Sequence, residues 1–300
     1  MIQGLIVLNK PGNITSHDAV DKVRNLFNIK KVGHFGTLDP LAEGILLIAL
    51  GKATKFFDFY IKKKKLYSGV IKFGYATATY DSEGEPVSEK KEIDLRKTDL
   101  DAILSGFIGK IAQVPPIYSA KKVKGKPLYK YARENKKVQI KPINIEIFSL
   151  QKKVLGKDTL WFETLTSSGT YIRSLAHDIG QKTGVGAYLE SLERLKIGGF
   201  DIRNSVTLDE LTEQVQSGGI AKVVIPIESL LPEFPKIIVN QGGRKAVLNG
   251  LPLEVKDIIK VLSPEKSEFF RLFDEEGKLL SISRKDVKLM RFNPHIVFPD

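Results

Sequence analysis

The sequence has no cysteine, only four histidines and only two methionines among its 300 residues. Without cysteine, neither a disulfide framework nor a thiol nucleophile is possible, and the scattered histidines give no cluster with metal-ligand spacing. No apolar run approaches the length of a bilayer-spanning helix. The first residues, from Met1 to Lys10, have no basic leader before their apolar run, so we expect a first strand there. These absences predict a cytoplasmic protein without a membrane anchor.

Acidic residues are scarce relative to basic ones, with 35 Asp and Glu against 47 Lys and Arg, a net charge of +12. Such a surplus favours a polyanionic partner, nucleic acid first and an anionic membrane second. The alternative is a charge-rich solvated surface, as in heat-adapted proteins, although such a surface does not require this imbalance. The 42% of hydrophobic residues and 16 phenylalanines indicate a folded protein, and the length predicts two domains.

Several catalytic signatures are also missing, since the sequence has no Walker loop, no dinucleotide fingerprint and no Ser-His-Asp arrangement. The most informative stretch is instead residues 33–44, GHFGTLDPLAEG, which runs into the apolar segment 45–50. Its glycines and Pro40 predict a tight loop, and the apolar segment predicts a strand buried on both faces. Asp39 would then be a carboxylate mounted on a rigid edge, as reactive groups often are. The alternative is an ordinary Asp-Pro turn.

Apolar periodicity and capping residues predict further elements along the chain. Strands are expected at 4–8, 66–73, 143–147 and 160–165. Helices are expected after Thr15 up to Asn28, after Thr98, after Ser167 up to Gly180 or Gly184, around Leu189, Leu192 and Leu195, and after Thr207. Arg173 falls in the first turn of the third of these helices, where the helix dipole disfavours a cation, which suggests that it pairs with a distant carboxylate.

Residues 121–141 contain nine basic residues and one acidic residue, with Tyr129 and Tyr131 among them. Such a segment resists burial and repels itself, so we expect a mobile insertion. Its natural partner is a phosphate backbone, and ordering on contact with RNA is expected. The alternative is a surface loop without a role.

Pro226, Pro232 and Pro235 mark the expected domain boundary. Short strand-like pieces follow at 237–239, 258–262, 269–273 and 279–282, the last two joined as a hairpin by 274–277. A small β-barrel is the natural interpretation.

These residues allow one kind of chemistry in particular. An aspartate can be a covalent nucleophile, provided that a cationic partner keeps it ionised when it is buried. Arg173 is the candidate partner, through a bidentate pair that lysine could not copy. Stacking tyrosines and a basic groove suit an unpaired base turned out of an RNA fold.

The loop around Asp39 resembles the signature of the TruB-type tRNA pseudouridine-55 synthases. Five further motifs stand in that family's order: KLY at 65–67, VPPIYSA at 114–120, GKPLY at 125–129, GTYIRSLA at 169–176 and GAYL at 186–189. Each short motif is weak alone, but together and in register they are very specific. The resemblance covers roughly residues 4–230, and the tail resembles the PUA RNA-binding module.

The resemblance implies an α+β pseudouridine-synthase fold over residues 1–232, with a mixed, mostly antiparallel central sheet flanked by helices and loops. A PUA-like β-barrel would follow over 235–300. The implied activity is isomerisation of uridine 55 in the T-stem loop of tRNA, with the target base flipped out. No cofactor or metal, no membrane and no protein partner is implied, and the expected state is a monomer.

Roles are implied residue by residue. Asp39 would attack the target uridine, at the sugar C1′ or the base C6, and Arg173 would pair with it. Tyr67 would stack on the base, and Tyr171 would stack as well or take the C5 proton. The remaining implied contacts to the nucleotide are His34 in the space that it vacates, Leu192 in the pocket wall, and Lys65. The implied RNA backbone contacts are Lys121, Lys122, Lys124, Lys126, Lys130 and Arg133.

Two positions depart from the family pattern. Phe35 stands where threonine is common, which would change packing behind the loop, and Glu193 stands where a basic residue is common. Two other functions stay open on the residues alone. The basic insertion and the barrel-like tail also suit an RNA-binding module or RNA chaperone, and binding of duplex DNA is a weaker third hypothesis.

Overall fold

A computed structural model describes residues 2–134, 136–262 and 267–299. Its main sheet has ten strands, and nearly all of the pairings are antiparallel, with β10 against β3 the parallel one. The expected α+β class with a mixed, mostly antiparallel sheet is therefore confirmed. In spatial order the strands are β12 (Ile225–Pro226), β1 (Gly4–Lys10), β3 (Glu43–Leu50), β10 (Ala187–Ile197), β4 (Lys65–Phe73), β9 (Thr159–Thr166), β8 (Ile143–Leu155) and β5 (Gly109–Gln113), with β2 (Val32–His34) beside β3 and β11 (Phe200–Asp201) beside β10.

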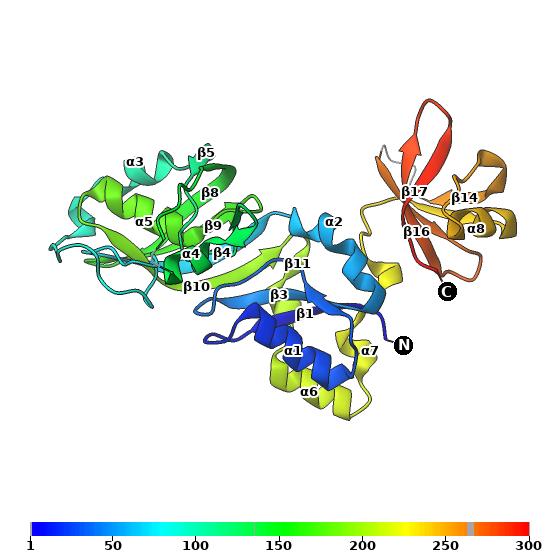
Figure 1. Cartoon of the computed structure of the whole chain (residues 1–300), viewed down its shortest axis with the longest axis horizontal. Coiled ribbons are helices and arrows are strands. Elements are labelled where there is room, and N and C mark those ends of the chain that lie inside the picture. The colour runs from blue at the N-terminus through cyan, green and yellow to red at the C-terminus, as the bar shows by residue number, and fades with distance from the viewer. Residues whose placement is uncertain (1, 135, 263–266, 300) are drawn as a thin grey trace.

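Helices cover this sheet in two places (Figure 1). One core cluster joins α3 (Leu100–Ser105) and α5 (Ile172–Thr183) to strands β4, β8 and β9. A second joins α1 (Ser16–Phe27), α6 (Leu208–Gln216) and α7 (Ile220–Val223) to β1 and β3. The strand β3 is buried along all but its first residue because side chains pack against both of its faces. Short helical segments complete this part: η1 (Gly51–Phe56), α2 (Phe57–Ile61), η2 (Leu95–Lys97), η3 (Ile202–Asn204) and η4 (Ile227–Ser229).

The capping boxes predicted at Thr15 and Thr207 are both present, at the first residues of α1 and α6. Two other helix starts are shifted. The N-cap of α3 is Asp99 instead of Thr98, because the Asp99 carboxylate accepts the Ala102 amide. Helix α5 begins only at Ile172, after a turn in which Thr170 donates to the Ser167 carbonyl.

The helix predicted around Leu189, Leu192 and Leu195 is wrong, because these residues belong to strand β10. The register of β10 against β4 shifts between Leu189 and Ser191, and again between Arg194 and Lys196. A β-bulge inserts one extra residue, so buried side chains in a bulged strand can be three residues apart instead of two. The bulges therefore imitate helical spacing in the sequence.

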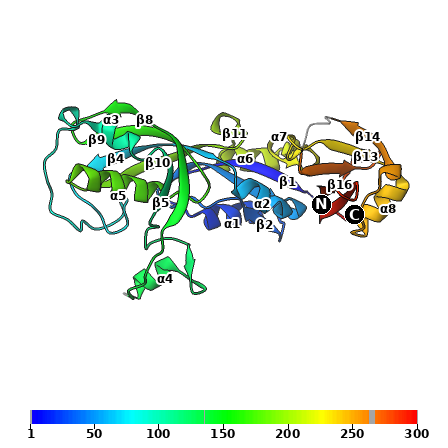
Figure 2. The ribbon, with the colours of Figure 1, turned by 90° about the horizontal axis from the view of Figure 1, so that it is seen from above.

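The basic segment 121–141 forms a hairpin, β6 (Lys122–Val123) and β7 (Lys126–Pro127), followed by α4 (Leu128–Arg133). Figure 2 shows α4 standing away from the body of the molecule. Leu128 is fully buried, and its amide donates to the Lys121 carbonyl, which gives the segment an anchor that its charge pattern did not suggest. Asn135 lies outside the described residues, and mobility of this insertion stays a prediction.

The remaining strands form a second sheet of five, at the other end of the long axis from α5 (Figure 1). Their order is β14 (Ile258–Leu262), β13 (Lys236–Val239), β15 (Phe269–Phe273), β16 (Leu279–Asp286) and β17 (Arg291–Val297). The predicted hairpin at 274–277 is confirmed. A closed barrel is not found in the described residues, since the outer strands β14 and β17 are not paired with each other. Residues 263–266 and Asp300, which the predicted second domain includes, lie outside the described ranges.

The second sheet also carries a helix that the sequence did not reveal, α8 (Gln241–Leu248), and a short turn, η5 (Val255–Asp257). Helix α8 begins with two glycines after its first residue, which weakens any helical pattern. The side chain of its N-cap residue, Asn240, accepts the Gly243 amide. This hydrogen bond stabilises the start of the helix, which the weak helix propensity of the glycines does not.

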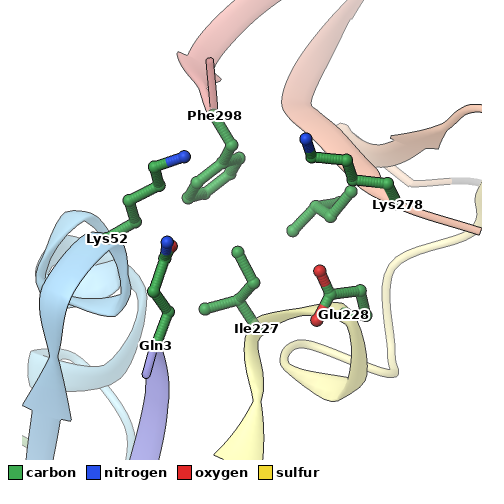
Figure 3. A pocket seen from close by; sticks show the side chains of 7 residues that line it. Gln3, Lys52, Ile227, Glu228, Lys278 and Phe298 are labelled. Carbon is green, nitrogen blue, oxygen red and sulfur yellow. The ribbon is translucent and has the colours of Figure 1, made fainter. Parts of the chain in front are cut away.

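The two sheets share one apolar core. The Phe56 ring stacks on Phe298 with centroids 5.2 Å apart, and Phe59 packs edge-on against Phe234 and Phe269. Beside this core lies a cavity of about 330 Å³, between Gln3 and Lys52 on one side and Lys278 and Phe298 on the other (Figure 3). None of the described helices is long and apolar enough to cross a membrane.

Candidate active site

The loop between β2 and β3 presents Asp39 at the edge of the main sheet. Ser16, the first residue of α1, holds the loop by accepting the Leu38 amide at 2.8 Å and donating to the Leu38 carbonyl at 3.0 Å. Pro40 accepts the Asn13 amide through its carbonyl at 2.8 Å. Gly36 has φ of 111°, a conformation that side-chain-bearing residues rarely adopt. The loop is therefore fixed on both sides of the carboxylate.

Arg173 binds Asp39 with a bidentate ion pair. Its Nε donates to Oδ2 at 2.8 Å and its Nη2 donates to Oδ1 at 3.0 Å. The Arg173 side chain is 5% exposed and that of Asp39 is 34% exposed, so the guanidinium is buried behind a carboxylate that faces solvent. Paired charge-assisted hydrogen bonds fix the plane of the carboxylate.

Three further groups complete the surroundings of Arg173. The Thr79 carbonyl accepts from Nη1 at 3.1 Å, the Tyr118 carbonyl accepts from Nη2 at 2.9 Å, and the Asp81 carboxylate lies 3.3 Å from Nη1. Asp81 is 3% exposed, so one buried guanidinium serves two carboxylates. Asp81 could not be predicted from the sequence, because residues 77–84 show only the polar composition of a turn.

A cleft of about 780 Å³ opens over this ion pair and brings together several of the predicted site residues. Those that line it are Asp39, Lys65, Tyr67, Lys121, Arg133, Tyr171 and Arg173. Tyr67, which the resemblance implies stacks on the base, is only 6% exposed, because alternate residues of β4 face the core. Only part of the Tyr67 ring therefore borders the cleft.

Burial changes the acid–base properties of two residues that line the cleft. It raises the pKa of the Tyr171 hydroxyl, mainly through desolvation. The Lys65 ammonium donates to the Ile61 and Lys63 carbonyls, both at 2.9 Å. Desolvation, with the nearby Arg194 charge, lowers the Lys65 pKa to about 8. Lys65 is therefore held by protein carbonyls on the wall of the cleft.

His34 and Leu192 are not among the residues that line the cleft. His34 ends β2, and its Nδ1 is buried with no hydrogen-bond partner in the described residues. Burial is the main cause that lowers the His34 pKa, so the neutral imidazole is favoured. Leu192 is 7% exposed and belongs to the same core cluster as Tyr67.

Among the cations of the insertion in the described residues, Lys121 and Arg133 line the cleft. The other predicted RNA contacts, Lys122, Lys124, Lys126 and Lys130, lie outside the cleft wall. The Lys126 ammonium is paired with Glu134, and the Arg133 guanidinium lies 5.6 Å from the centre of the Tyr129 ring. Tyr129 itself lines the cleft, so an aromatic ring and a cation stand together at its rim.

The two departures from the family pattern have different surroundings. Phe35 is 1% exposed and stacks on Tyr60 with centroids 5.5 Å apart. Its backbone amide donates to the Leu47 carbonyl at 2.9 Å. Phe35 therefore packs behind the loop, in the apolar core that the two sheets share. Glu193 lies on β10 opposite Glu43 of β3, and its side chain is partly exposed.

Comparison with known proteins gives the family. The profile described as "TruB family pseudouridylate synthase (N terminal domain)" matches residues 24–172, and the "tRNA pseudouridylate synthase B C-terminal domain" matches residues 173–232. The tRNA pseudouridine synthase B of Solibacter usitatus is 40% identical over 94% of this chain and 95% of its own length. The protein of the same name from Aquifex aeolicus is 37% identical over 94% of this chain and 99% of its own length.

A solved structure described as a Cbf5-Nop10-Gar1 complex is similar to 99% of this chain, over 85% of its own chain, with a TM-score of 0.73 and 25% identity. A second, described as an H/ACA RNP bound to a substrate RNA containing 2′-deoxyuridine, has the same coverage and TM-score at 23% identity and supports the fold alone. On the family profiles and the near full-length relatives, the chain belongs to the TruB family of pseudouridylate synthases, enzymes that isomerise uridine.

Proposed function

We propose that this chain converts uridine 55 in the T-stem loop of tRNA to pseudouridine, with Asp39 as the nucleophile. The observation that carries the proposal is the half-exposed Asp39 carboxylate, held by a buried bidentate arginine on the wall of a cleft. The relatives named tRNA pseudouridine synthase B support the choice of tRNA as substrate.

The reaction breaks the N1–C1′ bond of the uridine and forms a C5–C1′ bond, with a proton lost from C5 and one gained at N1. Asp39, oriented by its bidentate pair with Arg173, attacks either the sugar C1′ or the base C6, and its release completes the exchange. Since Arg173 is itself buried and anchored by backbone carbonyls, the carboxylate has little freedom to turn away from the substrate.

Tyr67 and Tyr171 contact the target base. Tyr67 stacks on the flipped base from the β4 side of the cleft, and Tyr171 lies on the wall beside Arg173. The raised pKa of Tyr171 makes its phenolate scarce at neutral pH, which favours stacking over removal of the C5 proton. His34 and Leu192 would act from behind this wall, on the displaced nucleotide and on the packing of Tyr67.

RNA is held by the basic insertion and by the second sheet. Lys121 and Arg133 reach the phosphates nearest the target base, and Lys122, Lys124, Lys126 and Lys130 follow the backbone outward along the hairpin and α4. We assign residues 1–232 to a catalytic domain and 235–300 to a PUA-like RNA-binding domain, in a cytoplasmic monomer that needs no protein partner.

The test is release of tritium from a T-stem-loop RNA that carries uridine labelled at C5. The wild-type chain should release tritium, and Asp39→Asn should reduce the rate at least about 1,000-fold while the affinity for RNA changes little. Turnover by Asp39→Asn at the wild-type rate would contradict the assignment of the nucleophile.

An accessory role as an RNA chaperone is favoured by the size of the basic insertion. It predicts that assistance to tRNA folding survives in Asp39→Asn, since binding does not need the nucleophile. Equal affinity for duplex DNA at the same salt concentration would instead favour non-specific binding.

A further inference from the structure

Arg194, on strand β10, is a buried arginine that the reaction described above does not use. It is 1% exposed, and it is one of the residues that line the cleft. Its main partners are backbone carbonyls instead of a carboxylate. Nε donates to the Ile45 carbonyl at 2.8 Å, Nη2 to the Gly36 carbonyl at 3.0 Å and Nη1 to the Thr37 carbonyl at 3.3 Å.

These three carbonyls bracket Asp39 in the chain. Gly36 and Thr37 come before the carboxylate, and Ile45 comes after it, at the point where the loop has become strand β3. One rigid guanidinium therefore ties together the two ends of the loop that carries Asp39. The planar fork of arginine can satisfy three separate acceptors in this way, whereas the single ammonium of lysine cannot keep the same geometry.

Arg194 is also the direct cross-strand partner of Tyr67 in the pairing of β10 with β4. The nearby Tyr67 hydroxyl partly offsets the desolvation that lowers the Arg194 pKa. The backbone of β10 fits closely against the loop at Gly44, where an added Cβ would lie 2.4 Å from the Arg194 carbonyl oxygen. Gly44 has φ of 97°, so both its space and its conformation exclude a larger residue. Strand β10 is thus in direct contact with the loop and with β4, on which Tyr67 stands.

We propose that Arg194 is a positioning residue that sets the distance and angle between the Asp39 carboxylate and the Tyr67 ring. Arg194 contacts the loop of Asp39 and the strand of Tyr67 but not the substrate. Its loss therefore misaligns the Asp39 carboxylate and the Tyr67 ring, which both have to contact the same nucleotide. The inference rests on the proposed function, because it assigns the arrangement of that same site.

The experiment compares Arg194→Lys with Arg271→Lys in the full chain. Arg271 is a matched control, since its guanidinium also donates to backbone carbonyls, among them Phe234 at 2.9 Å, but it lies at the junction of the two sheets. Tritium release from the labelled T-stem loop gives kcat and KM, and thermal unfolding shows that each variant is folded at the assay temperature.

Arg194→Lys should lower kcat at least tenfold with KM within twofold of wild type, and Arg271→Lys should leave both within twofold. In a Tyr67→Phe background the Arg194→Lys effect should shrink, because the Tyr67 hydroxyl whose charge interaction favours the guanidinium is already absent. An unchanged kcat, or a raised KM with normal kcat, in folded Arg194→Lys would overturn the proposal.

If Arg194→Lys does not fold, Tyr67→Phe alone decides the tyrosine half of the proposal: a fall in kcat at constant KM supports it, and wild-type kcat overturns it. Failure of the proposed function would look different, since the wild-type chain itself would release no tritium.

Discussion

At the scale of single residues, the site depends on the geometry of the Arg173 guanidinium as well as on its positive charge. Arg173 makes two hydrogen bonds to Asp39 and two to carbonyls, and a lysine could keep only one or two of these. The conservative variant therefore separates the effect of geometry from the effect of charge.

We expect Arg173→Lys to lower kcat about 100-fold, equivalent to about 2.7 kcal/mol of transition-state stabilisation. The reason is that the Asp39 carboxylate loses its fixed orientation while it keeps a nearby positive charge. Single-turnover tritium release measures the effect, and a rate within threefold of wild type would show that charge alone is sufficient.

Lys65 provides a test that depends on pH. Its pKa is lowered to about 8, so between pH 8 and its ordinary value of 10.5 the unfolded chain holds a proton that the folded chain has released. Stability rises with pH where the unfolded state binds more protons, so the contribution of Lys65 becomes more favourable across this window.

The free energy of unfolding of wild type relative to Lys65→Met should therefore increase by about 2 to 3 kcal/mol between pH 7 and pH 10. Urea unfolding of both proteins at each pH gives this difference, and groups other than Lys65 cancel in the comparison. Parallel curves for the two proteins would mean that Lys65 is solvated in the folded chain.

At the scale of elements, the short hairpin and α4 bring two cations to the cleft, while their neighbours point elsewhere. Lys121 and Arg133 line the cleft, and Lys126 is paired with Glu134. Equal charge in the sequence thus does not predict equal contribution to RNA binding.

Lys121→Glu and Arg133→Glu should each raise KM about tenfold or more, leave kcat close to wild type and reduce the slope of log K against log salt concentration by about one. Lys182→Glu, at the far end of α5 from Arg173, is the control for net charge and should change KM less than twofold. An equal effect of all three variants would indicate long-range attraction instead of contact.

At the scale of the whole molecule, the two sheets are joined by one apolar core and not only by the connecting chain. Phe298, 1% exposed, stacks on Phe56, and the Lys55 ammonium donates to the Val297 carbonyl at 2.6 Å. This arrangement predicts that the second sheet unfolds together with the first.

Phe298→Ala should cost about 3 to 5 kcal/mol, because it removes a buried ring from a core that cannot close around the gap. Urea unfolding followed by circular dichroism should show one transition for wild type and an earlier one for the variant. Removal of the ring without loss of stability would mean that the two sheets are independent.

Much of the site could be predicted from the sequence, for local reasons. Glycines and Pro40 mark the loop of Asp39, alternation marks β4, capping boxes mark α1 and α6, and the misplaced cation in the first turn of α5 suggests a distant carboxylate partner for Arg173. The family motifs predicted membership of the TruB family, and the family profile and the relatives confirm it.

Other features depend on contacts that are distant in the sequence. Asp81 and Arg194 are polar residues in segments whose local pattern is that of a turn and a helix, and only burial beside Asp39 makes them part of the site. Strand β10 has helical spacing because bulges displace its side chains, and its partners β3 and β4 decide its conformation. The sequence by itself determined the loop, the charge and the family, since these are encoded by neighbouring residues. Only the tertiary structure decided which buried charges meet at the Asp39 loop, because that depends on which strands lie side by side.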